Sequence, residues 1–111
     1  MALLQIMNGV KGPLPQKVQF NSQTDGPAYL TLAGSAWSPT ANVTIGVVLQ
    51  LDGTAVGSAV IFSNQPSEHR ALIPVQIPVQ LTSGAHTVTL VPLNGQTTTD
   101  VNDYFYVSLI Y

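Results

Sequence analysis

The chain has 111 residues, and only 3 are basic and 5 acidic, so charged side chains make up 7% of the sequence and the formal net charge is −2. Three cations cannot neutralise a run of phosphates, which argues against nucleic-acid binding, and no apolar run reaches the ~20 residues needed for membrane insertion. A hydrophobic fraction of 45% argues against disorder, and the lack of cysteine excludes disulfides and thiolate chemistry.

The length predicts one domain spanning residues 1–111. Residues 1–17 are expected to form an N-terminal strand or arm, with strand candidates at 3–7 and 17–20, and the remainder is expected to form a sandwich. The first seven residues are mostly apolar, but they lack a basic flank and Lys11 follows too soon, so they do not resemble a signal peptide.

The central part of the chain alternates with the period of a β-strand. Residues 28–34 form the first clear strand, and in residues 43–51 every second side chain is aliphatic. Asp52-Gly53 follows at once and precedes another strand over 54–62. An Asp-Gly pair between two such runs predicts a hairpin with a type I′ turn, because both turn positions need a positive φ.

After a polar loop over 63–70, residues 71–81 have the composition of a strand but contain Pro74 and Pro78. Proline cannot donate to a strand ladder, so this segment is predicted to be an edge strand, or a strand whose proline side is unpaired. Further strands are predicted at 85–91 and 102–111. About eight strands with turns between them, and no amphipathic helix, predict an all-β, single-domain antiparallel β-sandwich or jelly roll.

The final strand is apolar or aromatic on both faces, whereas a strand of a sandwich normally has one polar face exposed to solvent. One face carries Tyr104, Tyr106, Ser108 and Ile110, and the other carries Phe105, Val107, Leu109 and Tyr111. An exposed aromatic patch of this size would be a liability, so Tyr104, Tyr106 and Ile110 are predicted to form a subunit interface. The alternative is a central strand covered by a loop or by the N-terminal segment.

The order of these features resembles the C1q/TNF-like jelly-roll family. The resemblance is carried by residues 43–59, which include Asp52-Gly53, by Leu81-Thr82-Ser83-Gly84 with the strand after it, and by the aromatic ending 103–110. The resemblance covers roughly residues 19–111, and the chain contains no collagen-like Gly-X-Y stalk. The resemblance implies a jelly-roll fold and a homotrimer that binds a ligand at its surface, as in TNF-like bacterial lectin domains or the head domains of phage fibres.

Four groups are candidates for a ligand site. Glu68, His69 and Arg70 form the densest charge cluster, which can read sugar hydroxyls or an acidic partner, or can simply be a solvated loop or an intersubunit salt bridge. Trp37 can stack on a sugar or close one end of the core, and Tyr29 has the same two interpretations.

Asp100, Asn102 and Asp103 offer oxygen ligands for calcium, although Asp and Asn side chains are more often turn caps. The sequence contains no motif of a hydrolase, a metalloprotease or a phosphate-binding loop, so no catalytic residue and no other cofactor are predicted.

These features together predict a trimeric, non-catalytic, extracellular or virion-associated recognition module that binds a glycan or another cell-surface ligand. The alternative is a structural trimerisation domain or receptor-binding head of a phage tail fibre or surface appendage. An enzyme would need a deep pocket that holds His69 or His86 beside a carboxylate.

Overall fold

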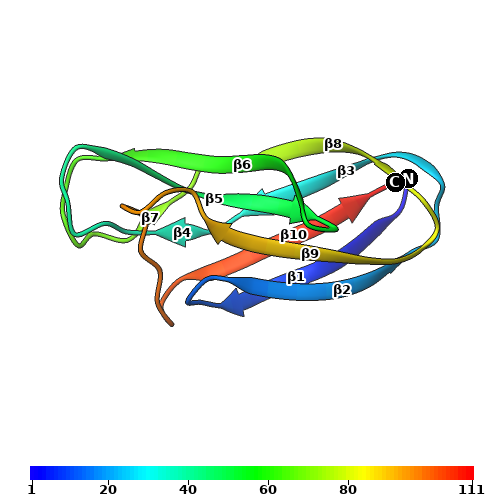
Figure 1. Ribbon diagram of the computed structural model, residues 1–111, viewed down its shortest axis with the longest axis horizontal. Coiled ribbons are helices and arrows are strands. Elements are labelled where there is room, and N and C mark those ends of the chain that lie inside the picture. The colour runs from blue at the N-terminus through cyan, green and yellow to red at the C-terminus, as the bar shows by residue number, and fades with distance from the viewer.

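Ten strands make up the regular structure of the computed structural model, which describes residues 1–111 (Figure 1). Their bounds are β1 Leu3–Lys11, β2 Gln16–Ser22, β3 Gly26–Ala33, β4 Ser35–Ala36, β5 Val43–Leu51, β6 Thr54–Ser63, β7 Arg70–Ala71, β8 Val75–Leu81, β9 Gly84–Pro92 and β10 Tyr104–Ile110. No helix capable of crossing a membrane is present.

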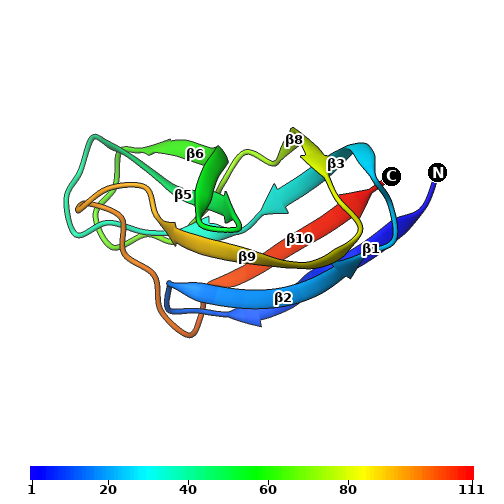
Figure 2. The ribbon, with the colours of Figure 1, turned by 45° about the vertical axis from the view of Figure 1, so that its right-hand side comes forward.

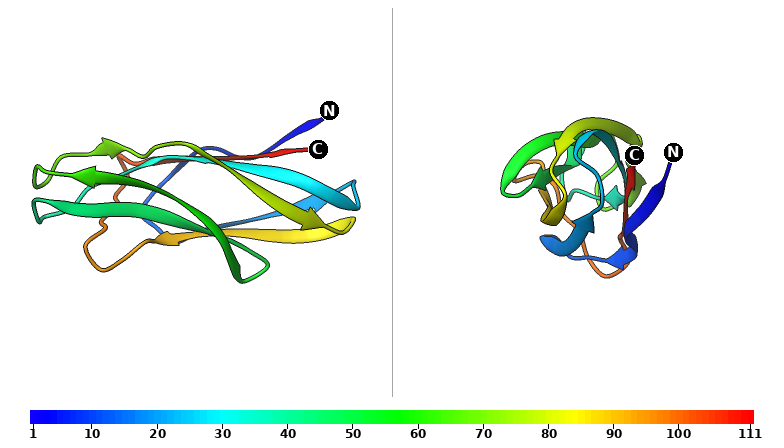
Figure 3. Two further views of the ribbon diagram at one scale, coloured as in Figure 1. Left: turned by 90° about the horizontal axis from the view of Figure 1, so that it is seen from above. Right: turned by 90° about the vertical axis from the view of Figure 1, so that its right-hand side faces the viewer.

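Eight of the strands form two antiparallel sheets that pack face to face (Figure 3). The first sheet has the order β1-β10-β3-β8, and the second has the order β2-β9-β5-β6. This order is that of a jelly roll, so the all-β fold class and the jelly-roll topology predicted from the sequence are confirmed. The two remaining strands, β4 and β7, pair with each other outside these sheets.

The β5–β6 hairpin forms as the alternation predicts. Its inward side chains on β5, among them Ile45, Val47 and Leu49, are fully buried between the sheets. Asp52 and Gly53 have φ angles of 51° and 85°, which are the two positive values that a type I′ turn requires.

The prolines of the 71–81 segment lie where proline is tolerated. β8 is the outermost strand of the first sheet, and Pro78 lies opposite Tyr29 of β3. The predicted edge position is therefore confirmed. Pro74 lies just before β8, so it disturbs no strand ladder.

The N-terminal and C-terminal strands lie side by side (Figure 2). The segment 1–17, expected as a strand or arm, contains β1, which pairs with β10, and the first residues of β2. The last strand begins at Tyr104 and not at Asn102, as the sequence suggested, because Asp103 donates its backbone N–H to the Asp100 carbonyl in a turn (3.0 Å).

The two faces of β10 differ in exposure. Phe105, Val107 and Leu109 are fully buried between the sheets, whereas 41% of Tyr104 and 46% of Tyr106 are exposed. The Tyr106 ring lies beside Gly9 of β1, yet nearly half of this residue stays exposed, so the strand presents an aromatic outer face, as its pattern indicates.

The sandwich is elongated, with extents of 43 × 23 × 21 Å. Both termini lie at one end of it, on the right in Figure 1. At the opposite end lie β4, β7 and the loops 37–42, 63–69 and 93–103. We refer to this second end as the loop end.

Candidate functional site

The loop end brings together residues that lie far apart in the sequence. His69 directly precedes β7, Asp103 directly precedes β10, and Ser35 belongs to β4. With Trp37 and Asp100 they form a group that we call the His69 cluster. The sequence placed His69 in one candidate site and the two aspartates in another, and the fold joins the two.

Asp103 organises the His69 cluster. Its carboxylate is fully buried and accepts three hydrogen bonds: from the Ser35 hydroxyl (2.7 Å), from the Asp100 backbone N–H (2.8 Å) and from His69 Nδ1 (2.7 Å). Its backbone carbonyl also accepts the N–H of Gly12 (2.8 Å). A buried carboxylate is costly unless it is hydrogen-bonded, and these donors offset that cost while they fix the loops.

Asp100 lies at the rim of the same cluster. One of its oxygens accepts the Asn102 backbone N–H (2.8 Å), and the other, Oδ2, lies 3.6 Å from His69 Nε2. His69, Asp100 and Asp103 each offer a possible ligand atom, and these atoms lie within 4.8 Å of one another. Asn102 takes part in this arrangement through its backbone N–H, which donates to Asp100. Calcium binding by Asp100, Asn102 and Asp103 stays a prediction.

Trp37 packs beside His69, with the ring centroids 5.9 Å apart and the planes tilted by 43°. The backbone N–H and carbonyl of Trp37 both hydrogen-bond to the backbone of Thr98, and this antiparallel bridge anchors the segment that follows β4. The indole is half-buried, and its Nε1 is buried without a hydrogen-bond partner. Trp37 therefore closes part of the loop end and also borders the surface that His69 exposes.

The other two residues of the predicted charge cluster have different surroundings. Glu68 is exposed, and Arg70 is half-buried in β7, where it pairs with Ala36. Neither forms an ion pair. Both charges therefore remain available on the loop end beside His69.

Tyr29 lies apart from this cluster. It is half exposed on β3, six residues from Ser35, which corresponds to roughly 20 Å along an extended strand. Its neighbours on the outer face of the first sheet are Ile110 of β10 and Pro78 of β8. Sequence reasoning placed Tyr29 with the ligand residues because the pairing of β3 with β10 is not readable from local pattern.

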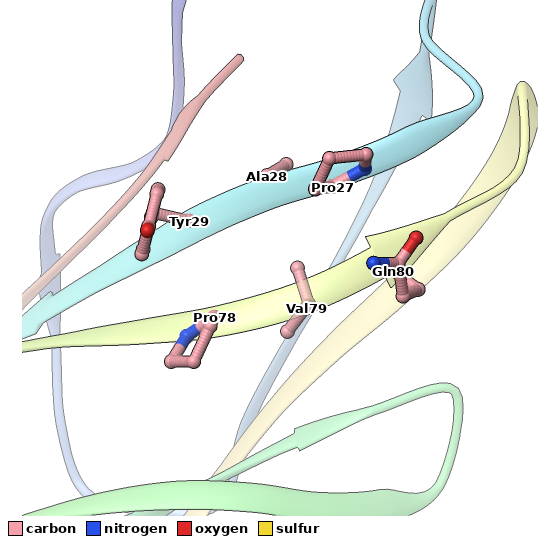
Figure 4. Close-up of a pocket in the computed structure, with 6 residues that line it drawn as sticks. All are labelled: Pro27, Ala28, Tyr29, Pro78, Val79 and Gln80. Atoms are coloured by element: carbon pink, nitrogen blue, oxygen red, sulfur yellow. The ribbon is translucent and has the colours of Figure 1, made fainter.

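Tyr29, Tyr104, Tyr106 and Ile110 share this outer face, which we call the tyrosine face. An open groove of about 240 Å³ runs between β3 and β8 beside Tyr29 (Figure 4). A second depression of about 430 Å³, lined mainly by apolar residues, lies on the other side of Tyr29 and reaches Ile110 and Tyr111. Of the predicted interface residues, Tyr104 and Tyr106 are therefore exposed and Ile110 is half-buried on one sheet face.

The second histidine, His86, forms a pair that sequence reasoning did not anticipate. His86 Nδ1 lies 2.6 Å from an Asp52 carboxylate oxygen, and Nε2 donates to the Thr82 carbonyl (2.6 Å). The Asp52 hydrogen bond raises the pKa of His86 and lowers the pKa of Asp52. The imidazole also stacks on Phe20, 5.7 Å between centroids. With both nitrogens bonded, this side chain has a structural role in joining the β5–β6 turn to β9.

Neither histidine lies in a deep pocket. The third surface depression, about 390 Å³, is open and has no hydrophobic residue in its lining, which includes Asp52 and Lys17 but not His86. His69 lines none of the three depressions and has 36% of its side chain exposed. The geometry thus offers a surface for contact at the loop end and no enclosed reaction site around either histidine.

No protein-family model and no curated protein matches the sequence. Solved structures do share the fold. They include the globular domain of a zebrafish complement 1qA protein (13% identity, 97% of this chain and 94% of that one, TM-score 0.60). They also include a family 35 carbohydrate binding module from Clostridium thermocellum (9%, 98% of each chain, 0.55) and a baseplate tripod of bacteriophage Tuc2009 (16%, 97% and 62%, 0.62). At identities this low the likeness establishes the fold alone.

Proposed function

We propose that this chain is a non-catalytic recognition module that forms a homotrimer, binds carbohydrate at its loop end and works outside the cell or on a virion. The observation that carries the proposal is the grouping of Trp37, His69 and Asp100 at the exposed loop end. Sugars are recognised by aromatic surfaces together with directional hydrogen-bonding groups. The loop end offers both.

The surroundings of the cluster support a ligand-binding surface. Glu68 and Arg70 form no ion pair within the chain, so their charges can contact a ligand. Asp103 and Ser35 hold the loops from beneath, so the exposed groups are positioned before a ligand arrives. Preorganised groups lose less entropy on binding, which favours affinity for a small polar ligand.

The tyrosine face supports the trimer. Tyr29, Tyr104 and Tyr106 each expose between 41% and 50% of their surface on one sheet. Aromatic residues are enriched at the buried centres of protein interfaces. The face lies on the outer side of the first sheet and begins at Tyr104, directly after Asp103, so a trimer assembled through it would place its interface beside the proposed ligand site.

The solved structures with the same fold agree with this proposal in a general way. One is a carbohydrate binding module, and another belongs to a phage baseplate tripod. Fold likeness does not select a ligand. The proposal therefore depends on measurements made on this chain.

A glycan array followed by calorimetric titration tests carbohydrate binding. The titration is run with calcium and with a chelator, because Asp100 and Asp103 are among the calcium ligands expected from the sequence. Arg70→Ala should weaken binding at least about tenfold, since a hydrogen bond from a charged group contributes about 1.5–3 kcal/mol. Lys17→Ala is the matched control, because Lys17 is an exposed cation on β2 of the other sheet. Absence of saccharide binding under both conditions would contradict the proposal.

Light scattering at micromolar concentration tests the trimer. The parent chain should have three times the mass of one chain, and Tyr106→Glu should yield a monomer, because the carboxylate would be buried in the interface. Phe62→Glu is the matched control: Phe62 is 55% exposed, but it lies on β6 of the other sheet. A parent chain that is monomeric would refute the assembly.

A structural role in a phage fibre or surface appendage is the second candidate. It is favoured by the exposed aromatic row of the tyrosine face and by the likeness to the phage tripod. This role predicts a trimer that resists heat and detergent and that binds no saccharide. The glycan array and the light-scattering mass together separate the two candidates.

A further inference from the structure

His69 is oriented as metal-binding histidines are. Its Nδ1 faces the buried Asp103 carboxylate at 2.7 Å, and the other donors to that carboxylate are the Ser35 hydroxyl and the Asp100 N–H. A carboxylate accepts hydrogen bonds, so Nδ1 carries the proton and the lone pair of a neutral imidazole lies on Nε2. A carboxylate behind the histidine is the arrangement that fixes the tautomer of metal ligands.

Nε2 lies near the one Asp100 carboxylate oxygen that accepts no hydrogen bond. Asp100 Oδ1 accepts the Asn102 N–H, whereas Oδ2 lies 3.6 Å from His69 Nε2. Bonds of about 2.0–2.2 Å to zinc place two tetrahedral ligands roughly 3.4 Å apart. The observed separation is therefore close to that of two atoms chelating one ion, and slightly long for a direct hydrogen bond.

The donor atoms select the class of ion. Calcium takes six to eight oxygen ligands, and here the free atoms are one imidazole nitrogen and one carboxylate oxygen. Imidazole nitrogen suits zinc, nickel and copper. Asp103 is fully buried, and its oxygens already accept three hydrogen bonds, so it supports His69 and is not itself a free ligand.

We propose that His69 Nε2 and Asp100 Oδ2 bind a divalent ion of the zinc class, with Asp103 as the positioning residue. Water or an external ligand completes the coordination. The ion would tie the loop before β7 to the loop before β10. His86 provides an internal contrast, because Asp52 and Thr82 occupy both of its nitrogens and leave none for a metal. This site shares His69 and Asp100 with the proposed sugar-binding surface, but metal binding is measured without a saccharide, so either proposal can fail without the other.

The test is a zinc chloride titration of the full chain, followed by the side-chain ¹⁵N signals of the two histidines in NMR spectra and by thermal unfolding. Zinc should shift the His69 signals with one ion per chain, leave the His86 signals in place and raise the melting temperature. Asp100→Asn, at an exposed rim position, should weaken the affinity by tenfold or more. His86→Gln should leave it unchanged.

Three results would overturn the inference. The first is that millimolar zinc leaves the His69 signals unmoved, and the second is that zinc binds Asp100→Asn as tightly as the parent chain. The third is saturation of the same His69 signals by calcium chloride at equal concentration, which would assign the group to the other class of ion. Asp103→Asn is a secondary variant, and the exposed Asp100→Asn keeps the test valid if that buried substitution does not fold.

Discussion

Phe105 occupies a space that two glycines leave open, and this predicts an energetic coupling between β10 and the β3–β4 junction. The ring is fully buried. A Cβ added to Gly34 would lie 2.6 Å from Phe105 Cδ1, and one added to Gly12 would lie 3.4 Å from Cε2. Neither glycine has a side chain that could fill the space if the ring were removed. Phe105→Ala should therefore cost near the upper end of the usual ~3–5 kcal/mol for such a truncation.

The coupling is measured with a milder change, because Phe105→Ala could exhaust the stability of a small domain. Gly34→Ala in the parent chain should destabilise the fold by about 1–3 kcal/mol through overpacking against the ring. In a Phe105→Leu background the same change should cost much less, because the ring carbon at 2.6 Å is gone and the new methyl group fills part of the vacated space. The coupling free energy is expected to be at least about 1 kcal/mol.

Urea unfolding followed by circular dichroism on the four proteins of this cycle gives the coupling directly. Gly95→Ala is a matched control, since no atom lies within 4 Å of the added Cβ. It should be additive with Phe105→Leu. If Gly34→Ala and Phe105→Leu are also additive within about 0.5 kcal/mol, the ring does not occupy this space and the reasoning fails.

The remaining predictions concern charge, turn geometry and assembly. The hydrogen bond between His86 and Asp52 raises the pKa of His86 above its ordinary 6.5 and lowers the pKa of Asp52 below its ordinary 3.8. The pair should stabilise the fold most between these two ordinary values, less as pH rises through the raised His86 pKa, and less as pH falls through the lowered Asp52 pKa. Urea midpoints across pH should show this maximum and lose it in Asp52→Asn; parallel curves for both proteins would contradict it. Gly53→Ala should lower the free energy of unfolding by about 1 kcal/mol, because Gly53 has a φ of 85° that alanine resists, and an unchanged melting temperature would argue against the type I′ turn. Replacing Tyr29 and Tyr106 by serine should remove the dependence of the unfolding midpoint on protein concentration that a trimer confers, and a dependence that persists would place the interface elsewhere.

The parts of the fold that were predictable from the sequence are those that local chemistry decides. The alternation over 43–51 identifies the buried face of β5, because a strand turns successive side chains to opposite sides. Asp52-Gly53 specifies its turn through φ, and Pro78 excludes a central position for β8. Each of these signals lies within a few residues of the feature it determines.

The His69 cluster was only partly predictable, because it depends on contacts between distant loops. The residues Glu68–Arg70 and Asp100–Asp103 were recognised separately, as chemistry that loops commonly carry. Their meeting is set by the hydrogen bond between His69 and Asp103, which lie 34 positions apart in the sequence. The two-residue strands β4 and β7 that frame this contact are too short to leave a periodic pattern.

The position of β10 between β1 and β3 has a consequence for how the chain reaches its folded state. β1 pairs in its sheet only with β10, so Leu3 finds its partner Ile110 at the far end of the sequence. Loop-closure entropy must be lost before such pairings contribute, and domains dominated by them fold in milliseconds to seconds. Until β10 is in place, β1 has no strand partner and one edge of β3 is open. Asp103 then also lacks its hydrogen bonds to His69 and Ser35 at the loop end. The proposed recognition surface should therefore be among the last parts of the molecule to become ordered, and variants that weaken β10 should slow its appearance more than they disturb the β5–β6 hairpin.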